Sequence, residues 1–119
     1  MNNKSFIHNI GKRYSRWFNF KFNRRAHIMG LRFTTTWKCN SRCITCAIWK
    51  EENAGKDDLS VQEIDQFSKS KYFRNLEYIT ISGGEPTLRP DLPEIISVLH
   101  KNIPHAPFSI TTHGMSPQT

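Results

Sequence analysis

The sequence predicts an α/β fold in which three β-strands alternate with two α-helices. Runs of β-branched and aromatic residues occur at three places, separated by segments whose apolar residues recur every three or four positions. Each helical segment is long enough to cross back over a sheet, so we expect parallel strands joined by right-handed crossovers. The expected strands are Leu31–Trp37, Leu76–Ser82 and Phe108–Thr112.

Both expected helices have recognisable ends. Ser60 can cap the first helix, and Glu63 stands three residues later, as a capping box requires. The second helix is expected to start at Asp91 as its N-cap, with Pro93 in the first turn, and to stop before Pro104. The apolar positions fall on one face of each helix: Val61, Ile64 and Phe67 in the first, and Leu92, Ile95, Ile96 and Leu99 in the second.

Length and charge limit the classes of protein to which the chain can belong. A chain of 119 residues suits one domain, and its net charge of +7 is unevenly placed. Residues 1–50 contain eleven Lys or Arg and no acidic residue, whereas residues 51–119 contain six basic and ten acidic residues. No run approaches the roughly 18 apolar residues of a membrane-spanning helix, and no secretory signal is visible. We therefore expect the protein in the cytoplasm.

The basic residues belong to an N-terminal extension, residues 1–30. Within Ser5–Asn19 the apolar residues recur at helical spacing, which predicts a basic amphipathic helix. The interpretation we favour is that this helix packs on the rest of the protein. The second is peripheral contact of residues 1–25 with an anionic membrane surface. A nucleic-acid contact through the cluster Lys21, Arg24 and Arg25 is the least favoured.

All three cysteines lie in one short stretch, directly after the first expected strand. Cys39, Cys43 and Cys46 form a CxxxCxxC pattern. A disulfide would leave one thiol over, whereas a metal ion or an iron-sulfur cluster uses all three. A structural zinc site needs a fourth ligand, such as His113. A cluster held by three cysteines instead leaves one iron open for a small molecule.

Two further motifs follow the other expected strands. Gly83-Gly84-Glu85 comes after the second strand, and Thr112-His113-Gly114 closes the third. The carboxyl ends of parallel strands meet at one edge of a sheet, and ligands bind there. We therefore expect the cysteine loop and both motifs to line one site.

The three motifs, in this order and spacing, resemble those of the radical S-adenosylmethionine (radical SAM) enzymes. The resemblance rests on the cysteine loop, on Ile79–Pro86 and on Ile110–Gly114, and it covers residues 31–119. It implies a partial (β/α) barrel of the radical SAM type, of which this sequence has the first three strands with their crossover helices. We therefore expect residues 31–119 to be the N-terminal half of a truncated core domain.

The resemblance also implies the cofactors. Cys39, Cys43 and Cys46 would hold a 4Fe-4S cluster, and S-adenosylmethionine (SAM) would bind its fourth iron. An electron donor would supply the electron that cleaves SAM, and the adenosyl radical would abstract hydrogen from a substrate. The residues expected to contact SAM are Gly83, Gly84, Glu85, Thr45 and Thr112, with Glu85 accepting from the methionine ammonium group.

Two features of the motifs complete the expectation. No catalytic residue is expected beyond the cluster ligands. His113 stands where the family commonly has Asn, and we interpret it as a polar residue beside the turn glycine. The alternative function is a structural zinc module with a basic N-terminus that contacts nucleic acid or a membrane.

Overall fold

The computed structural model describes Phe18 and residues 28–115. The amphipathic helix expected within residues 5–19, and most of the extension, lie outside these residues and stay predictions. The described elements, in chain order, are β1 (Gly30–Thr34), η1 (Ile48–Lys50), α2 (Val61–Ser68), η2 (Lys71–Phe73), β2 (Tyr78–Ser82), η3 (Pro86–Leu88), α3 (Leu92–Asn102) and β3 (Phe108–Ile110). The three η elements are short 3-10 helices.

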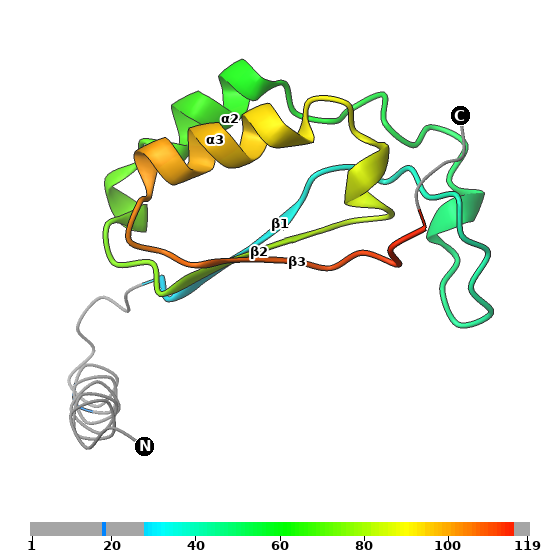
Figure 1. The fold of residues 1–119 in the computed structure, drawn as a ribbon, viewed down its shortest axis with the longest axis horizontal. Coiled ribbons are helices and arrows are strands. Elements are labelled where there is room, and N and C mark those ends of the chain that lie inside the picture. Colours follow the sequence, from blue (N-terminus) through cyan, green and yellow to red (C-terminus); the bar gives the residue numbers. More distant parts are fainter. Residues whose placement is uncertain (1–17, 19–27, 116–119) are drawn as a thin grey trace.

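The three strands form one parallel sheet in the order β1-β2-β3. Ile79 of β2 pairs with Leu31 of β1 on one side and with Phe108 of β3 on the other. Helices α2 and α3 lie together over one face of this sheet, so the fold has two layers (Figure 1). This confirms the predicted α/β fold with parallel strands, and it fits a fragment of a radical SAM barrel.

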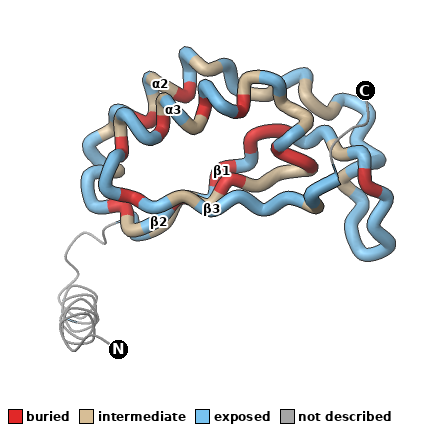
Figure 2. Tube along the Cα trace, viewed as in Figure 1, coloured by how far each residue is buried: buried red, intermediate tan, exposed pale blue. Residues whose placement is uncertain are grey.

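The hydrophobic core lies between the helices and the sheet. Figure 2 shows the buried residues in red along both layers. Alternate strand residues point into it, which is why Ile79 and Ile81 are fully buried while Tyr78 is half exposed. The buried apolar residues are Phe33, Ile64, Leu76, Ile79, Ile81, Leu92, Ile95, Leu99, Ile103 and Ala106. The stripes expected on the two helices thus supply the helix side of the core.

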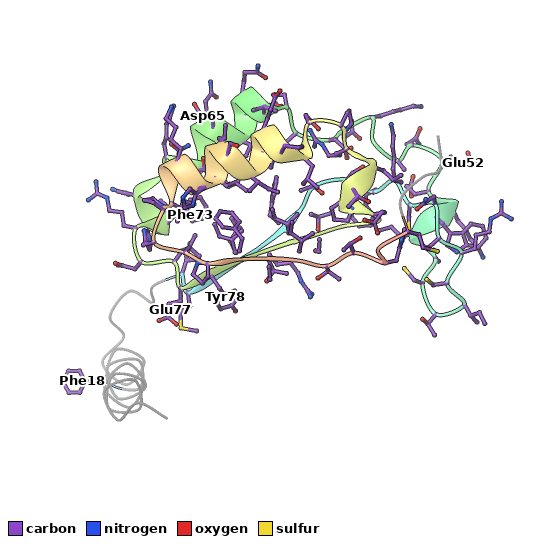
Figure 3. The ribbon with its side chains drawn as sticks, viewed as in Figure 1. Phe18, Glu52, Asp65, Phe73, Glu77 and Tyr78 are labelled. Carbon is purple, nitrogen blue, oxygen red and sulfur yellow. The ribbon has the colours of Figure 1, made fainter. Side chains whose placement is uncertain are left out.

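The opposite face of the sheet is polar. Arg32 and Thr34 of β1 are exposed there, and the Ser109 hydroxyl donates to the Thr80 hydroxyl at 3.0 Å. Figure 3 shows Tyr78 on this side of the sheet, away from Asp65 in the helix layer. In a (β/α) barrel this is the face that points inward.

Both predicted N-cap positions are confirmed, but only the first cap makes its side-chain hydrogen bonds. The Ser60 hydroxyl accepts from the Glu63 N–H at 3.3 Å, and the Glu63 carboxylate accepts from the Ser60 N–H at 2.8 Å, which completes the capping box. Asp91 stands at the N-cap of α3 but makes no capping bond. Its carboxylate is held by Arg89 instead.

Arg89 also fixes how the helix layer meets the sheet. Its guanidinium donates to the Thr35 carbonyl at 2.8 Å, just past β1, and to the Leu59 carbonyl at 3.0 Å, just before α2. Its Nε and Nη2 also donate to the Asp91 carboxylate at the start of α3. One planar guanidinium therefore joins the end of a strand to the starts of both helices.

In the described part of the chain, no helix is long and apolar enough to cross a membrane.

Candidate cofactor site

The motifs that follow β2 and β3 meet at the carboxyl edge of the sheet, as expected. The Glu85 carboxylate, three residues past β2, accepts hydrogen bonds from Thr112 and His113, just past β3. The His113 ring also lies 2.7 Å from the side-chain oxygen of Asn40, which stands between Cys39 and Cys43. This edge therefore joins segments from all three strand ends.

Glu85 is the centre of this arrangement and is fully buried. Its Oε1 accepts from the Thr87 N–H at 3.2 Å, the Thr87 hydroxyl at 2.7 Å and the Thr112 hydroxyl at 2.7 Å. Its Oε2 accepts from the His113 N–H at 3.0 Å and lies 3.1 Å from His113 Nε2. These donors occupy the roughly four lone-pair positions of a carboxylate.

The donors keep Glu85 charged although it is buried. Burial by itself would raise the pKa of this carboxyl group, because a dry environment penalises the ionised form. The hydrogen bonds from Thr112, His113 and Thr87 outweigh burial and lower the pKa from 4.5 to about 2. The site therefore contains a fixed negative charge at physiological pH.

Gly83 and Gly84 let the segment after β2 lie directly against the segment after β1. The Gly84 N–H donates to the Thr36 carbonyl and the Glu85 N–H to the Lys38 carbonyl, both at 2.8 Å. A Cβ atom on Gly84 would stand 2.2 Å from the Lys38 carbonyl oxygen, and one on Gly83 would stand 2.3 Å from that of Thr36. Gly83 also has a φ of 143°, which favours glycine.

This contact explains why β1 ends earlier than expected, whereas β2 ends at Ser82 as expected. We expected the first strand to run to Trp37, but β1 ends at Thr34 and the regular ladder stops at the Thr34–Ser82 pair. Beyond it the two segments stay hydrogen-bonded through an irregular backbone that turns at Gly83. The two glycines thus place Glu85 beside the start of the cysteine loop.

The three cysteines are free thiols on the loop after β1. Cys43 and Cys46 are exposed and Cys39 is partly buried. Among the described residues, no three His, Cys, Asp or Glu side chains are grouped as a metal site. The Cys46 N–H donates to the Cys43 carbonyl at 3.3 Å. The backbone of residues 39–46 makes no other hydrogen bond to the backbone of the described residues.

The donor set nevertheless fits an iron-sulfur cluster. Thiolates are the ligands that such clusters prefer, and three of them lie within eight residues of a loop with little internal bonding. Metal sites commonly take their final geometry only as the metal binds. Convergence of Cys39, Cys43 and Cys46 on one cluster thus requires a local rearrangement of this loop.

The other residues expected to contact SAM differ in their surroundings. Thr45 is exposed on the cysteine loop. The Thr112 hydroxyl donates to Glu85 and accepts from the Gly114 N–H at 3.0 Å, so its donor is already in use. The structure joins Thr112 to Glu85 by a hydrogen bond, and among the described residues it has no hydrogen bond between Thr45 and Gly83–Glu85.

The alternative zinc site receives no support from His113. The ring nitrogen Nδ1 accepts from the Met115 N–H at 2.9 Å, and Nε2 faces Asn40 and Glu85. Both nitrogens that could bind zinc are therefore engaged with protein atoms. We expected His113 to be a polar residue beside the turn glycine, but its ring also faces Asn40 and Glu85.

Three residues of the site were missed by the sequence reasoning. Asn40 and Thr87 gave no distinctive signal, since polar residues are common in loops. The role of Arg89 could not be recognised either, because the carbonyl groups that it binds are distant in sequence. The short spacing from Glu85 to Thr87 could have suggested a carboxylate capping the 3-10 turn η3, as the structure has it.

Comparison with known proteins identifies the family. The family model described as "Radical SAM superfamily" matches residues 33–118. The chain belongs to the radical SAM superfamily. The match includes the cysteine loop, the Gly-Gly-Glu segment and the end of β3.

Similar curated proteins are named as probable GTP 3',8-cyclases. The chain is 40% identical over 84 residues to that of Sulfolobus acidocaldarius, covering 71% of this chain and 26% of the relative. It is 42% identical over 89 residues to that of Methanococcus maripaludis, covering 74% and 29%. The radical SAM chain described here thus spans between a quarter and a third of the length of these relatives.

Gly84 gives the first prediction for this radical SAM chain. Gly84→Ala should lower the free energy of unfolding by about 3 kcal/mol, because the new methyl group collides with backbone that cannot move independently. Gly114→Ala is the matched control: its φ of 69° disfavours alanine, but nothing lies within 4 Å, so about 1 kcal/mol is expected. Urea unfolding measures both losses, and equal losses would contradict the steric explanation.

The Glu85 pKa gives the second prediction. Because the pKa is lower in the folded chain, the ionised carboxylate stabilises the fold fully above pH 4.5, and this stability is lost as the pH falls toward about 2. At pH 7, Glu85→Gln should cost about 3 kcal/mol, the equivalent of this shift. Urea unfolding of both proteins between pH 7 and pH 2 should show the difference narrowing below pH 4.5.

The control for this experiment is Glu94→Gln, since Glu94 is exposed in the first turn of α3. It should change stability by a few tenths of a kcal/mol at most. A Glu85→Gln difference that stays constant down to pH 2 would show that the charge of Glu85 is not what stabilises the fold.

Proposed function

We propose that this chain is the part of a radical SAM enzyme that binds a 4Fe-4S cluster through Cys39, Cys43 and Cys46. The observation that carries the proposal is the position of the three free thiols. They lie on one loop, which begins beside the Lys38 carbonyl that accepts from the Glu85 N–H and contacts the His113 ring through Asn40. When bound, the cluster supplies the electron for reductive cleavage of SAM, and the resulting radical abstracts hydrogen from a substrate.

SAM is proposed to bind beside Gly83, Gly84 and Glu85, with Thr45 and Thr112 at the margins of its site. A direct contact between Glu85 and the methionine ammonium requires one present donor to move, because the carboxylate is saturated. Its fixed charge attracts a cationic amine at short range even without that contact. Glu85 thus acts first by shaping the edge and second by its charge.

The partners follow from the same site. A substrate and an electron donor complete the proposed reaction. Cys43 and Cys46 are exposed, so a donor protein has access to the loop that would hold the cluster. We infer that the enzyme works in the cytoplasm, with residues 1–25 contacting an anionic membrane surface as a separate proposal.

The cluster proposal is tested by reconstitution. The chain, treated without oxygen with iron and sulfide, should take up about four irons, and SAM should change the electron paramagnetic resonance spectrum of the reduced cluster. Replacing Cys39, Cys43 and Cys46 together by Ala should abolish iron uptake. Ile44→Ala is the control, because this fully exposed side chain lies between two of the cysteines without ligating atoms.

Iron uptake by the triple variant equal to that of the wild type would end the proposal. Stoichiometric zinc without iron, in protein purified without oxygen, would favour the structural zinc module instead.

The membrane proposal is tested by vesicle sedimentation. The basic extension should bind vesicles that contain phosphatidylserine and not those of phosphatidylcholine alone, and added salt should weaken the binding. Lys12→Glu combined with Arg16→Glu reverses two charges of the extension and should reduce binding several-fold. Equal binding to both vesicle types would contradict an electrostatic contact.

A further inference from the structure

The His113 imidazole lies between the cysteine loop and the Gly-Gly-Glu segment. Its Nε2 is 2.7 Å from Asn40 Oδ1 and 3.1 Å from Glu85 Oε2. The backbone N–H of the same residue donates to Glu85 Oε2 at 3.0 Å. The His113 side chain is four-fifths buried and its partner Glu85 is fully buried, whereas Asn40 is exposed. One side chain thus touches segments that follow β1 and β2 while standing just past β3.

The hydrogen bonds determine which ring nitrogen carries the proton. The Met115 N–H donates to Nδ1 at 2.9 Å, so Nδ1 must be the acceptor of a neutral ring. The proton then lies on Nε2, which faces two acceptors, the amide oxygen of Asn40 and the carboxylate of Glu85. A single N–H shared between these oxygens draws both toward one point.

Asn40 matters because of its place in the chain. It follows Cys39 directly and precedes Cys43 by three residues, on a loop that has little hydrogen bonding of its own. Glu85 is anchored independently by Thr87 and Thr112. The His113 ring therefore transmits the fixed position of Glu85 to the first part of the cysteine loop.

We propose that His113 is a positioning residue that holds the cysteine loop, through Asn40, at a set distance from the Gly-Gly-Glu segment. The proposal rests on the proposed function for its purpose: the loop would carry the cluster and the segment would lie beside SAM. Cluster ligation needs only the three thiols. The distance between the cluster and SAM depends in addition on the contact between His113 and Asn40, which fixes where the loop begins.

The contact is tested first in the chain without iron. Nitrogen NMR of labelled histidine should show the neutral His113 ring protonated on Nε2. Backbone order parameters of residues 39–41, the first part of the cysteine loop, should fall in His113→Ala and in Asn40→Ala, from about 0.85 toward 0.6 or below. The double variant should fall no further than either single variant, because both remove the same link.

Matched variants separate the contact from general effects. Gln places an amide nitrogen near the position of imidazole Nε2, whereas Asn stops short, so His113→Gln should keep the loop ordered and His113→Asn should not. His105→Ala is the control, since His105 is exposed and outside the site. Additive losses in the double variant, or an equal loss of order in β1 and β2, would overturn the proposal.

The second test uses the reconstituted chain. His113→Ala and Asn40→Ala should keep the wild-type iron content and bind SAM about threefold to tenfold more weakly, the factor expected for one lost hydrogen bond. His113→Gln should restore the affinity. Unchanged SAM affinity at the wild-type iron content, or loss of iron from either variant, would overturn the positioning role.

The two proposals fail in different ways. A wild-type chain that takes up no iron contradicts the proposed function, whereas the order parameters of the iron-free chain still decide the role of His113. If the His113→Ala chain does not fold, Asn40→Ala and His113→Gln decide the question. Asn40→Ala changes only an exposed loop residue, and His113→Gln keeps a hydrogen-bond donor at this position.

Discussion

A buried carboxylate is the constraint on which this edge of the fold depends. Removing an ionised carboxyl group from water costs several kcal/mol unless donors replace the lost hydration. Glu85 obtains these donors from the turn that follows it and from the end of β3. Its low pKa of about 2 records that the replacement is more than complete. Neither segment can move away without leaving a charge unsatisfied.

The position of that carboxylate depends in turn on Gly83 and Gly84, which have no side chains. Glu85 reaches the strand ends because Gly83 and Gly84 let two backbones approach closely, with N–H groups donating to the carbonyls of Thr36 and Lys38. The glycines of the motif therefore act here by packing. That role differs from cradling a ligand, and it is compatible with it, because both need backbone without a Cβ atom.

Much of the fold could be predicted because it follows from local periodicity. The alternation around Ile79, the capping box of Ser60 and Glu63 and the parallel order of strands are all properties of short segments. Parallel pairing then placed the motifs at one edge without further knowledge. Asp91 stands at its predicted N-cap position but makes no capping bond, because Arg89, two residues earlier, offers two charge-assisted bonds that the Asp91 carboxylate accepts instead.

The contacts that organise the site could not be predicted in the same way. The bond from His113 to Asn40 joins residues 73 positions apart, and it depends on a ring orientation fixed by Met115. The saturation of Glu85 likewise depends on where β3 ends. Sequence patterns report which residues share a face, while the choice of partner across an edge is made by the tertiary fold.

The site therefore combines one rigid part with one adaptable part. The rigid part is the group around Glu85, which sits on strand ends and is held by hydrogen bonds from Thr112, His113 and the backbone. The adaptable part is the cysteine loop, whose thiols are free and whose backbone is weakly bonded within itself. A loop that must close around a metal cluster benefits from such freedom, because ligand geometry is set by the metal. A link at Asn40, placed beside the first cysteine, limits that freedom at one end only, so the loop can rearrange while its origin stays beside Glu85.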